Sequence, residues 1–264
     1  PYTTLFRSGV ERHQPHVDAG PKKVFSNSLN SSWPGDPEGN NAQRLACALH
    51  EAVVRDATHV LDLHCWQRLR ATTGLARTDR PDTIELTNVM GPPFGRHGLW
   101  KPEETERPVF PCTISNYFND SGRFGLTVEF SGQYGFWHIE LQRGGRMLRN
   151  AFRHFGMLPG EAEEPEHPTV WLNDCDQVEV HAPVEGVFVQ SPLTPGDRVR
   201  EGELLGHLFD TKTLESTRVY SPVGGYLFML GVQHDEVEQQ ERPFLHPYVP
   251  AGHIVATIAH PLRP

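Results

Sequence analysis

The sequence predicts a three-layer α/β unit over residues 9–158, followed by a compact all-β unit over residues 170–264. In the first unit, a helix-spaced apolar stripe leads directly into a short apolar strand, which is typical of α/β proteins. In the second unit, short strands alternate with glycine and proline turns, which is typical of an all-β fold. Residues 159–169 between them are acidic and proline-rich without an apolar face, which indicates an exposed linker.

The α/β prediction begins with one helix and the strand behind it. Leu45, Leu49 and Val53 recur every four positions on a polar background, the spacing of a surface helix between residues 40 and 56. Residues 59–66, HVLDLHCW, form a compact apolar run with β-favouring valine and leucine. We therefore expect a buried strand directly after the helix.

A second strand and a second helix complete the first unit. The segment FGLTVEF at 124–130 predicts the strand, and residues 137–155 have helical spacing with basic residues late in the helix, where they suit its dipole. Residues 77–111 are rich in proline, glycine, threonine and charge without periodicity. We expect long loops there, which in enzymes often form a substrate rim.

The all-β unit contains a weak internal repeat. The segment APVEG at 182–186 recurs as SPVGG at 221–225, and the pattern of a glycine followed by two spaced aliphatic residues at Gly202 recurs at Gly252. The repeat predicts two similar β-halves. The second half is expected to carry an insertion around residues 232–245.

The composition excludes several classes of partner. The formal net charge of −9, from 24 basic against 33 acidic residues, argues against nucleic acid, because phosphate binding needs a clustered cationic face. No apolar run approaches the roughly 20 residues that span a membrane. The cysteines at 47, 65, 112 and 175 form no CxxC pair, which favours reduced thiols in a cytoplasmic protein. We expect a small-molecule substrate, and the composition is compatible with a homo-oligomer without fixing the oligomeric state.

The first eight residues, PYTTLFRS, can be translated from the end of a common short-read sequencing adapter. We therefore expect residues 1–8 to carry no biological meaning, and the natural gene to continue upstream of about Gly9. The alternative is a natural strand over PYTTLF.

Two side chains near strand ends could carry chemistry. His64 closes the first strand, where an α/β sheet delivers catalytic groups, and its imidazole could bind Zn²⁺. The alternative is a hydrogen-bonded core histidine. Glu129 lies inside the second apolar strand, where a carboxylate needs a partner, a raised pKa or a metal-bound water. The alternative is a buried salt bridge.

The order and spacing of four segments resemble one known family. LNSSWPGD at 29–36, a helix bearing Arg44, DLH at 62–64 and VEF at 128–130 make residues 16–158 similar to the aspartoacylase/succinylglutamate desuccinylase family. The family is related in fold to zinc carboxypeptidases. The resemblance implies a three-layer zinc-carboxypeptidase-like core, incomplete at its N-terminus.

The resemblance also implies a mechanism and a substrate class. His64 would hold zinc together with the His and Glu of an early HxxE motif, and Glu129 would activate the zinc-bound water. Zinc lowers the pKa of its water towards about 7, while the carboxylate takes the proton and returns it to the leaving amine. The implied reaction is hydrolysis of an N-acyl amino acid amide or a related ester, so the implied small-molecule substrate is an N-acyl amino acid or a similar compound.

The early HxxE motif is absent from this sequence. His13 and His16 form HxxH, but they lie after the place where the motif should stand, so we interpret them as bystanders. N-terminal truncation explains the absence best. A single histidine ligand predicts that this chain binds zinc poorly and turns over little, because a catalytic zinc normally has three protein ligands.

The substrate-binding residues of the family are only partly matched. The family's Asn-Arg pair appears as Asn30 and Ser31, and Lys23 stands where a further family arginine is expected. Lysine lacks the bidentate fork of arginine, so the acidic substrate could differ. The missing charge could be supplied by Arg123, or by Arg68 or Arg70, each of which could equally be a plain surface residue.

Residues 170–264 resemble biotinyl/lipoyl domains, which implies a barrel-sandwich fold, with PGDxVxxG at 195–202 as the clearest motif. Turn glycines and buried valines explain that motif without a ligand. Lys212 lies about where carrier domains place their modified lysine, but the methionines that flank a biotinylated lysine are absent. Two alternatives to a deacylase therefore stay open: a carrier or binding module, and a metal-free pseudoenzyme.

Overall fold

The computed structural model describes residues 28–66, 69–97, 113–132, 138–165, 167–232 and 246–262, without the side chains of 173–176. The chain divides into two compact units. The first unit contains Pro1–Asp62 and Leu99–Thr127, and the second contains Leu63–Gly98 and Val128–Pro264. Strands β1 and β4 each begin in the first unit and end in the second.

The first unit is mainly helical in its described part. Its elements are η1 (Leu29–Ser31), α2 (Asn41–Leu49), the π-helical turn η2 (His50–Val54), α4 (Ile114–Asp120) and the beginnings of β1 (His59–Cys65) and β4 (Phe124–Phe130). The predicted helix between 40 and 56 is confirmed, and it begins with a capping box in which Asn40 Oδ1 accepts from Gln43 N at 3.0 Å. The buried positions of α2 are Ala42 and Ala46 rather than the predicted Leu45.

A small core holds this unit together. Trp33, Ala46, Val54 and Phe118 are its buried members. The WPGD turn can approach α2 closely because Gly35 has φ +103° and a Cβ there would lie 2.1 Å from the Cys47 backbone nitrogen. The LNSSWPGD segment is therefore built around packing on α2.

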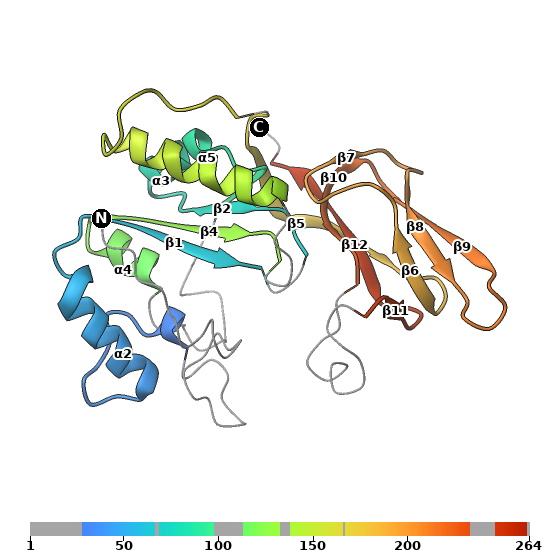
Figure 1. Cartoon of the computed structure of the whole chain (residues 1–264), viewed down its shortest axis with the longest axis horizontal. Helices are drawn as coiled ribbons and strands as arrows, with labels where there is room; N and C mark the ends of the chain where they lie inside the picture. The colour runs from blue at the N-terminus through green and yellow to red at the C-terminus, as the bar shows by residue number, and fades with distance from the viewer. Residues whose placement is uncertain are drawn as a thin grey trace. The chain divides into compact units, whose positions relative to one another are not determined.

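The second unit contains a large sheet with helices on it. Its elements are β2 (Thr73–Ala76), α3 (Pro81–Met90), β3 (Phe94–His97), α5 (His138–His154), β5 (Val170–His181), β6 (Gly186–Gln190), β7 (Arg198–Val199), β8 (Leu204–Phe209), β9 (Ser216–Tyr220), β10 (Gly225–Leu230), β11 (Tyr248–Val249) and β12 (Ile254–Pro261). Helices α3 and α5 pack together, and α3 contacts β2 and β3 (Figure 1). The predicted helix over 137–155 and the predicted strand over 124–130 are confirmed.

The prediction of loops over residues 77–111 is wrong for the part that forms α3 and β3, while residues 98–111 lie outside the described residues. Two of the four buried positions of α3 are threonines, Thr83 and Thr87, beside Leu86 and Met90. The apolar stripe is therefore too weak to show as a helical period in the sequence. Pro81 begins the helix, as proline commonly does in a first turn.

The eight-stranded sheet has the order β1-β4-β2-β3-β5-β12-β10-β7. Strand β3 pairs in parallel with β2 and with β5, whereas the pairs β5–β12, β12–β10 and β10–β7 are antiparallel. Strand β1 lies at one edge, and its side chains are half-buried or exposed rather than buried as predicted, with Leu63 45% exposed. The structure is thus a mixed α/β fold with a large parallel and antiparallel sheet.

Strand β5 joins the two parts of the chain that the sequence separates. It pairs in parallel with β3, with Phe94 opposite Val170 and Arg96 opposite Leu172. The same strand pairs antiparallel with β12. The sheet is therefore continuous across the predicted linker, and a separate all-β domain over 170–264 is not confirmed. The boundary at 159–169 stays a prediction.

The internal repeat is confirmed by the strands. The paired segments 182–186 and 221–225 lead into β6 and β10, and the paired glycines at 202 and 252 lead into β8 and β12. Strand β6 pairs with β8 as β10 pairs with β12. The two short strands, β7 and β11, each pair with a strand of the other half. Strand β7 pairs with β10, and β11 pairs with β6. The second sheet therefore has the order β11-β6-β8-β9.

Matching hydrogen bonds lock the two halves together. Gly202 N donates to Ser221 O at 2.8 Å, and the equivalent Gly252 N donates to Ala182 O at 2.8 Å. Each bond joins one half to the other. The two halves therefore share one core, and neither can complete its sheets alone. The predicted insertion lies outside the described residues, except Val232.

Candidate active site

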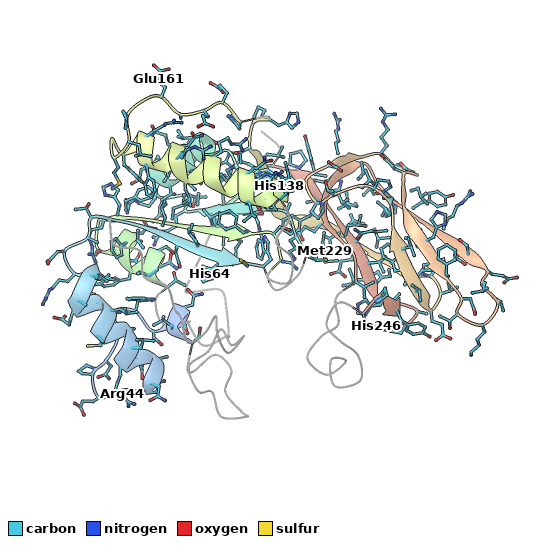
Figure 2. The ribbon with its side chains drawn as sticks, in the orientation of Figure 1. Arg44, His64, His138, Glu161, Met229 and His246 are labelled. Atoms are coloured by element: carbon cyan, nitrogen blue, oxygen red, sulfur yellow. The ribbon has the colours of Figure 1, made fainter. Side chains whose placement is uncertain are left out.

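Strands β1 and β4 are neighbours in the sheet, and His64 and Glu129 lie near their carboxyl ends. Phe124 N donates to Thr58 O at 3.2 Å where the strands begin, and Trp66 N donates to Phe130 O at 3.0 Å where they end. The strands are therefore parallel and end together (Figure 1). His64 and Glu129 are each the last residue but one of their strand, and Figure 2 shows His64 at this end of β1.

The Glu129 carboxylate is half-buried, and one of its oxygens is fully buried. Two effects raise the pKa of the Cys65 thiol at the end of β1. Burial has the larger effect, and the nearby negative charge of Glu129 raises the pKa further. Side chains alternate along a strand, so His64 and Cys65 point to opposite faces of β1. The meeting of Glu129 with His64 itself stays a prediction.

A hydrogen-bonded chain fixes the segment that follows Glu129. Ser131 N donates to Thr72 Oγ1 at 3.1 Å, and the Thr72 hydroxyl in turn donates to the Glu140 carboxylate. Glu140, in the first turn of α5, also pairs with Arg143. Thr72 is fully buried. Nothing in the sequence singled out Thr72 or Glu140, because both act through contacts between distant segments.

The predicted substrate-binding residues lie mainly in the first unit. Asn30 is exposed on η1, whereas Ser31 is buried and its hydroxyl donates to Ser28 O at 3.3 Å. Lys23 and Arg68 lie outside the described residues. Substrate binding by these residues stays a prediction, and the described contact of Ser31 is structural.

Arg123 has several contacts at the end of the α2–η2 helix. Its Nη1 donates to the carbonyls of Val54 at 3.2 Å, Arg55 at 3.3 Å and Ala57 at 3.0 Å. Its guanidinium also stacks on Phe118, with Cζ 3.9 Å from the ring centroid. These contacts satisfy carbonyls at the end of a helix. They support a structural role, and substrate binding by Arg123 stays a prediction.

The donors near the strand ends fit zinc in kind but not in number. Imidazole and carboxylate are both zinc ligands. Across the described residues, no three His, Cys, Asp or Glu side chains form a group that could hold a metal. Three protein ligands are the norm for a catalytic zinc, so His64 would need partners from other residues. Cys47 and Cys65 are free thiols.

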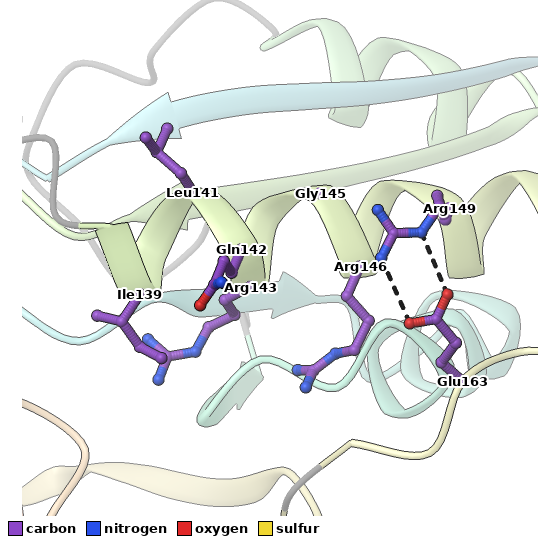
Figure 3. Close-up of a pocket in the computed structure, with 8 residues that line it drawn as sticks. All are labelled: Ile139, Leu141, Gln142, Arg143, Gly145, Arg146, Arg149 and Glu163. Atoms are coloured by element: carbon purple, nitrogen blue, oxygen red, sulfur yellow. Dashed lines mark hydrogen bonds and ion pairs between the residues drawn. The ribbon is translucent and has the colours of Figure 1, made fainter.

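A hollow lies along α5, lined by Ile139, Leu141, Gln142, Arg143, Gly145, Arg146, Arg149 and Glu163 (Figure 3). Arg149 holds both carboxylate oxygens of Glu163, at 3.2 and 3.3 Å, and Arg153 holds one at 2.8 Å. These hydrogen bonds lower the pKa of Glu163 to about 2. Asn150 also holds the Glu163 backbone through N–H and C=O, both at 2.8 Å. These contacts therefore hold the acidic segment against α5.

Lys212 is exposed in the hairpin between β8 and β9. The Asp210 carboxylate shapes this turn by accepting from Lys212 N at 2.7 Å and from Thr213 N at 2.9 Å. The bonds from the backbones of Thr213 and Lys212 lower the pKa of Asp210. A modification of Lys212 is not tested by this geometry.

The fold matches that of solved structures of other proteins. The structure of succinylglutamate desuccinylase/aspartoacylase from Rhodobacter sphaeroides matches with a TM-score of 0.63 and 18% identity, covering 97% of this chain and 72% of that one. This chain has the succinylglutamate desuccinylase/aspartoacylase fold. The apo ectoine utilization protein EutE (DoeB) from Ruegeria pomeroyi shares it, with a TM-score of 0.62 and 18% identity over 88% of this chain and 69% of that one.

One curated protein is similar to this chain in sequence. N-alpha-acetyl-L-2,4-diaminobutyric acid deacetylase from Halomonas elongata is 23% identical over an alignment of 198 residues that covers 69% of this chain and 54% of that protein. The chain thus spans about half the length of the curated relative that it matches. No protein-family model matches the chain. In the described part of the chain, no helix is long and apolar enough to cross a membrane.

Proposed function

We propose that this chain is part of a zinc-dependent deacylase that hydrolyses the amide of an N-acyl amino acid or a related ester. The observation that carries the proposal is the pair of parallel strand ends, joined by the Trp66–Phe130 hydrogen bond, that bring His64 and Glu129 to one edge of the sheet. The fold and the names of the relatives, a desuccinylase and a deacetylase, agree with this reaction class.

Each residue has a stated role in the proposed reaction. His64 would be one zinc ligand, and the His and Glu of an upstream HxxE segment would be the others. A bound zinc ion would supply Lewis-acid polarisation of the scissile carbonyl and of a water molecule. Glu129 would take the proton of the attacking water and return it to the leaving amine, which a half-buried carboxylate at a strand end can do. The Thr72–Glu140 pair would hold the segment behind it in place.

The proposal is tested by metal content and by turnover together. We expect the chain alone to bind zinc weakly, and the chain joined to its upstream coding segment to bind one zinc per molecule and hydrolyse N-acyl amino acids. In that protein, Glu129→Gln should lower kcat by about 10²–10⁴ with zinc retained, as the loss of a general base does, whereas His64→Ala should lose the metal. Glu201→Gln, an exposed site, is the control. Tight zinc and full activity in the chain alone would contradict the proposed ligand set.

A carrier function is the second candidate, because Lys212 is exposed in a tight hairpin. Intact-mass measurement of the protein from its natural host decides it. A lipoyl- or biotinyl-sized mass increase that disappears in Lys212→Arg would support the carrier function. An unmodified chain would exclude it and leave the deacylase as the proposed function.

A further inference from the structure

We propose that Arg70 and Arg96 form a carboxylate-binding subsite beside the ends of β1 and β4. The subsite rests on the proposed function for its place next to the reacting groups. It assigns the recognition of an acidic substrate to two arginines that lie outside the family motif segments of this sequence.

The two guanidinium groups gather on the same two aromatic rings. Arg70 Cζ lies 5.2 Å from the Trp66 ring centroid and 5.5 Å from that of Phe228. Arg96 Cζ lies 5.9 Å from each of the same centroids. Trp66 and Phe228 meet edge to face at 6.0 Å. The two guanidinium groups therefore lie over the same pair of aromatic rings.

Hydrogen bonds tie this cluster to both strand ends. Trp66 follows His64 by two residues and donates from its backbone to Phe130, the neighbour of Glu129. Its indole Nε1 donates to Ala71 O at 2.9 Å, and Ala71 N donates to Phe228 O at 2.9 Å. Arg70 forms a bridge with Met229 of β10. The cluster is therefore fixed in position relative to the proposed reacting groups.

A carboxylate is the ligand that this arrangement suits. Stacking on a ring uses the face of a guanidinium, whereas a carboxylate is bound by the N–H groups in its plane, often by two at once. Arg70 and Arg96 are half-buried, so their charges are screened less by water than those of surface arginines.

The subsite accounts for a departure noted in the sequence. Ser31 stands where the family pattern has an arginine, so that position cannot supply a guanidinium. Arg70 and Arg96 would supply two. The carboxylate could belong to the amino acid side or to the acyl side of the substrate, and both sources share the same recognition chemistry.

The test measures binding to the chain as it stands, so it needs neither zinc nor turnover. The probes are N-acetylglycine, with its carboxylate on the amine side, N-methylsuccinamate, with its carboxylate on the acyl side, and neutral N-acetylglycinamide. The indole N–H resonance of Trp66, assigned by its loss in Trp66→Phe, reports the subsite. We expect saturable shifts with at least one acid, and none with the neutral amide; the stronger acid identifies the carboxylate's side.

Substitutions of the two arginines complete the test. Arg70→Gln and Arg96→Gln should each weaken acid binding roughly tenfold or more, because each removes a charge-assisted hydrogen bond. Arg96→Lys should fall between wild type and Arg96→Gln, and Arg200→Gln, an exposed arginine of the same unit, should bind as wild type. Equal shifts with the neutral amide, or unchanged binding in both folded glutamine variants, would overturn the subsite. Acid binding without hydrolysis in the zinc-loaded longer protein would leave the subsite standing and refute the deacylase.

Discussion

At the scale of single residues, several arginines of this chain bond backbone carbonyls and aromatic rings as well as carboxylates. Arg123 bonds three carbonyls, Arg146 bonds Gly91 O at 3.0 Å, and Arg70 and Arg96 lie over rings. The role of each arginine depends on the groups near its guanidinium, and the residue type alone does not predict those groups.

Arg123→Met tests the helix-end role of this side chain. The variant removes the donors to the Val54 and Ala57 carbonyls and should lower the free energy of unfolding by about 1–3 kcal/mol, as for buried polar groups that lose a partner. Urea denaturation followed by circular dichroism measures it. Arg55→Met is the control, because its exposed i,i+4 pair with Glu51 contributes at most about 0.5 kcal/mol. An equal free energy of unfolding in both variants would contradict the helix-end role of Arg123.

Glu163 gives a pH dependence whose sign follows from its lowered pKa. Arg149 and Arg153 lower the pKa of this carboxylate from its ordinary 4.5 to about 2. The docking of its segment is therefore fully present above about pH 4.5 and is lost as the pH falls towards 2. Hydrogen exchange of the Glu163 amide, which donates to Asn150 Oδ1, should show protection at pH 5 that declines by pH 3 and with added salt.

Two variants provide the comparison for that measurement. Glu163→Gln should show little protection and no pH dependence between 5 and 3, because the ion pairs are gone. Glu161→Gln, an exposed position two residues away, should behave as wild type. Constant protection down to pH 3 in the wild type would show that Asn150 alone holds the segment.

At the scale of elements, the β-hairpin repeat shows how a weak sequence pattern becomes a precise structural requirement. Gly225 begins β10, and a Cβ there would lie 2.7 Å from an Ile258 methyl carbon and 2.8 Å from Ala259 O. Gly224, its neighbour, would meet its nearest atom at 3.7 Å. The two glycines look alike in the sequence, but only Gly225 is held against β12.

Alanine at these two positions should therefore have opposite effects. Gly225→Ala should lower the free energy of unfolding by about 1–3 kcal/mol, because the backbone must move to avoid overpacking. Gly224→Ala should leave it unchanged or raise it by about 0.4–1 kcal/mol, since alanine reduces the entropy of the unfolded chain. Thermal and urea unfolding of both variants measure the difference. A loss at Gly224 equal to that at Gly225 would mean that contact with β12 is not the cause.

At the scale of the whole molecule, the sheet joins parts of the chain that composition separates. The acidic segment at 159–168 has the composition of a linker, yet β5 behind it pairs with β3 before it. A cut in this segment therefore breaks the chain without removing either partner of the β3–β5 pair.

Limited proteolysis should show both properties. We expect cleavage between residues 159 and 168, because the segment is exposed, and we expect the two fragments to elute together in size-exclusion chromatography until denaturant is added. The outcome that refutes the continuous sheet is separation of the fragments under native conditions. Glu163→Gln should be cut faster than wild type, since its docking is weaker.

The sequence by itself determined the elements whose pattern is local. The strands over 59–65 and 124–130, the helix over 138–154 and the two β-halves all follow from periodicity or repetition within short segments. The family resemblance carried over His64 and Glu129 as candidates, and the parallel strands then placed them at one edge of the sheet.

Only the tertiary structure decided what depends on distant segments. Helix α3 was missed because threonines occupy half of its buried face, and the gathering of Arg70 and Arg96 on Trp66 and Phe228 joins three separate parts of the chain. The continuity of the sheet through β5 likewise depends on pairing with β3. Composition and periodicity report the preferences of neighbouring residues, whereas strand order, ring contacts and charge clusters arise from contacts between residues far apart in sequence.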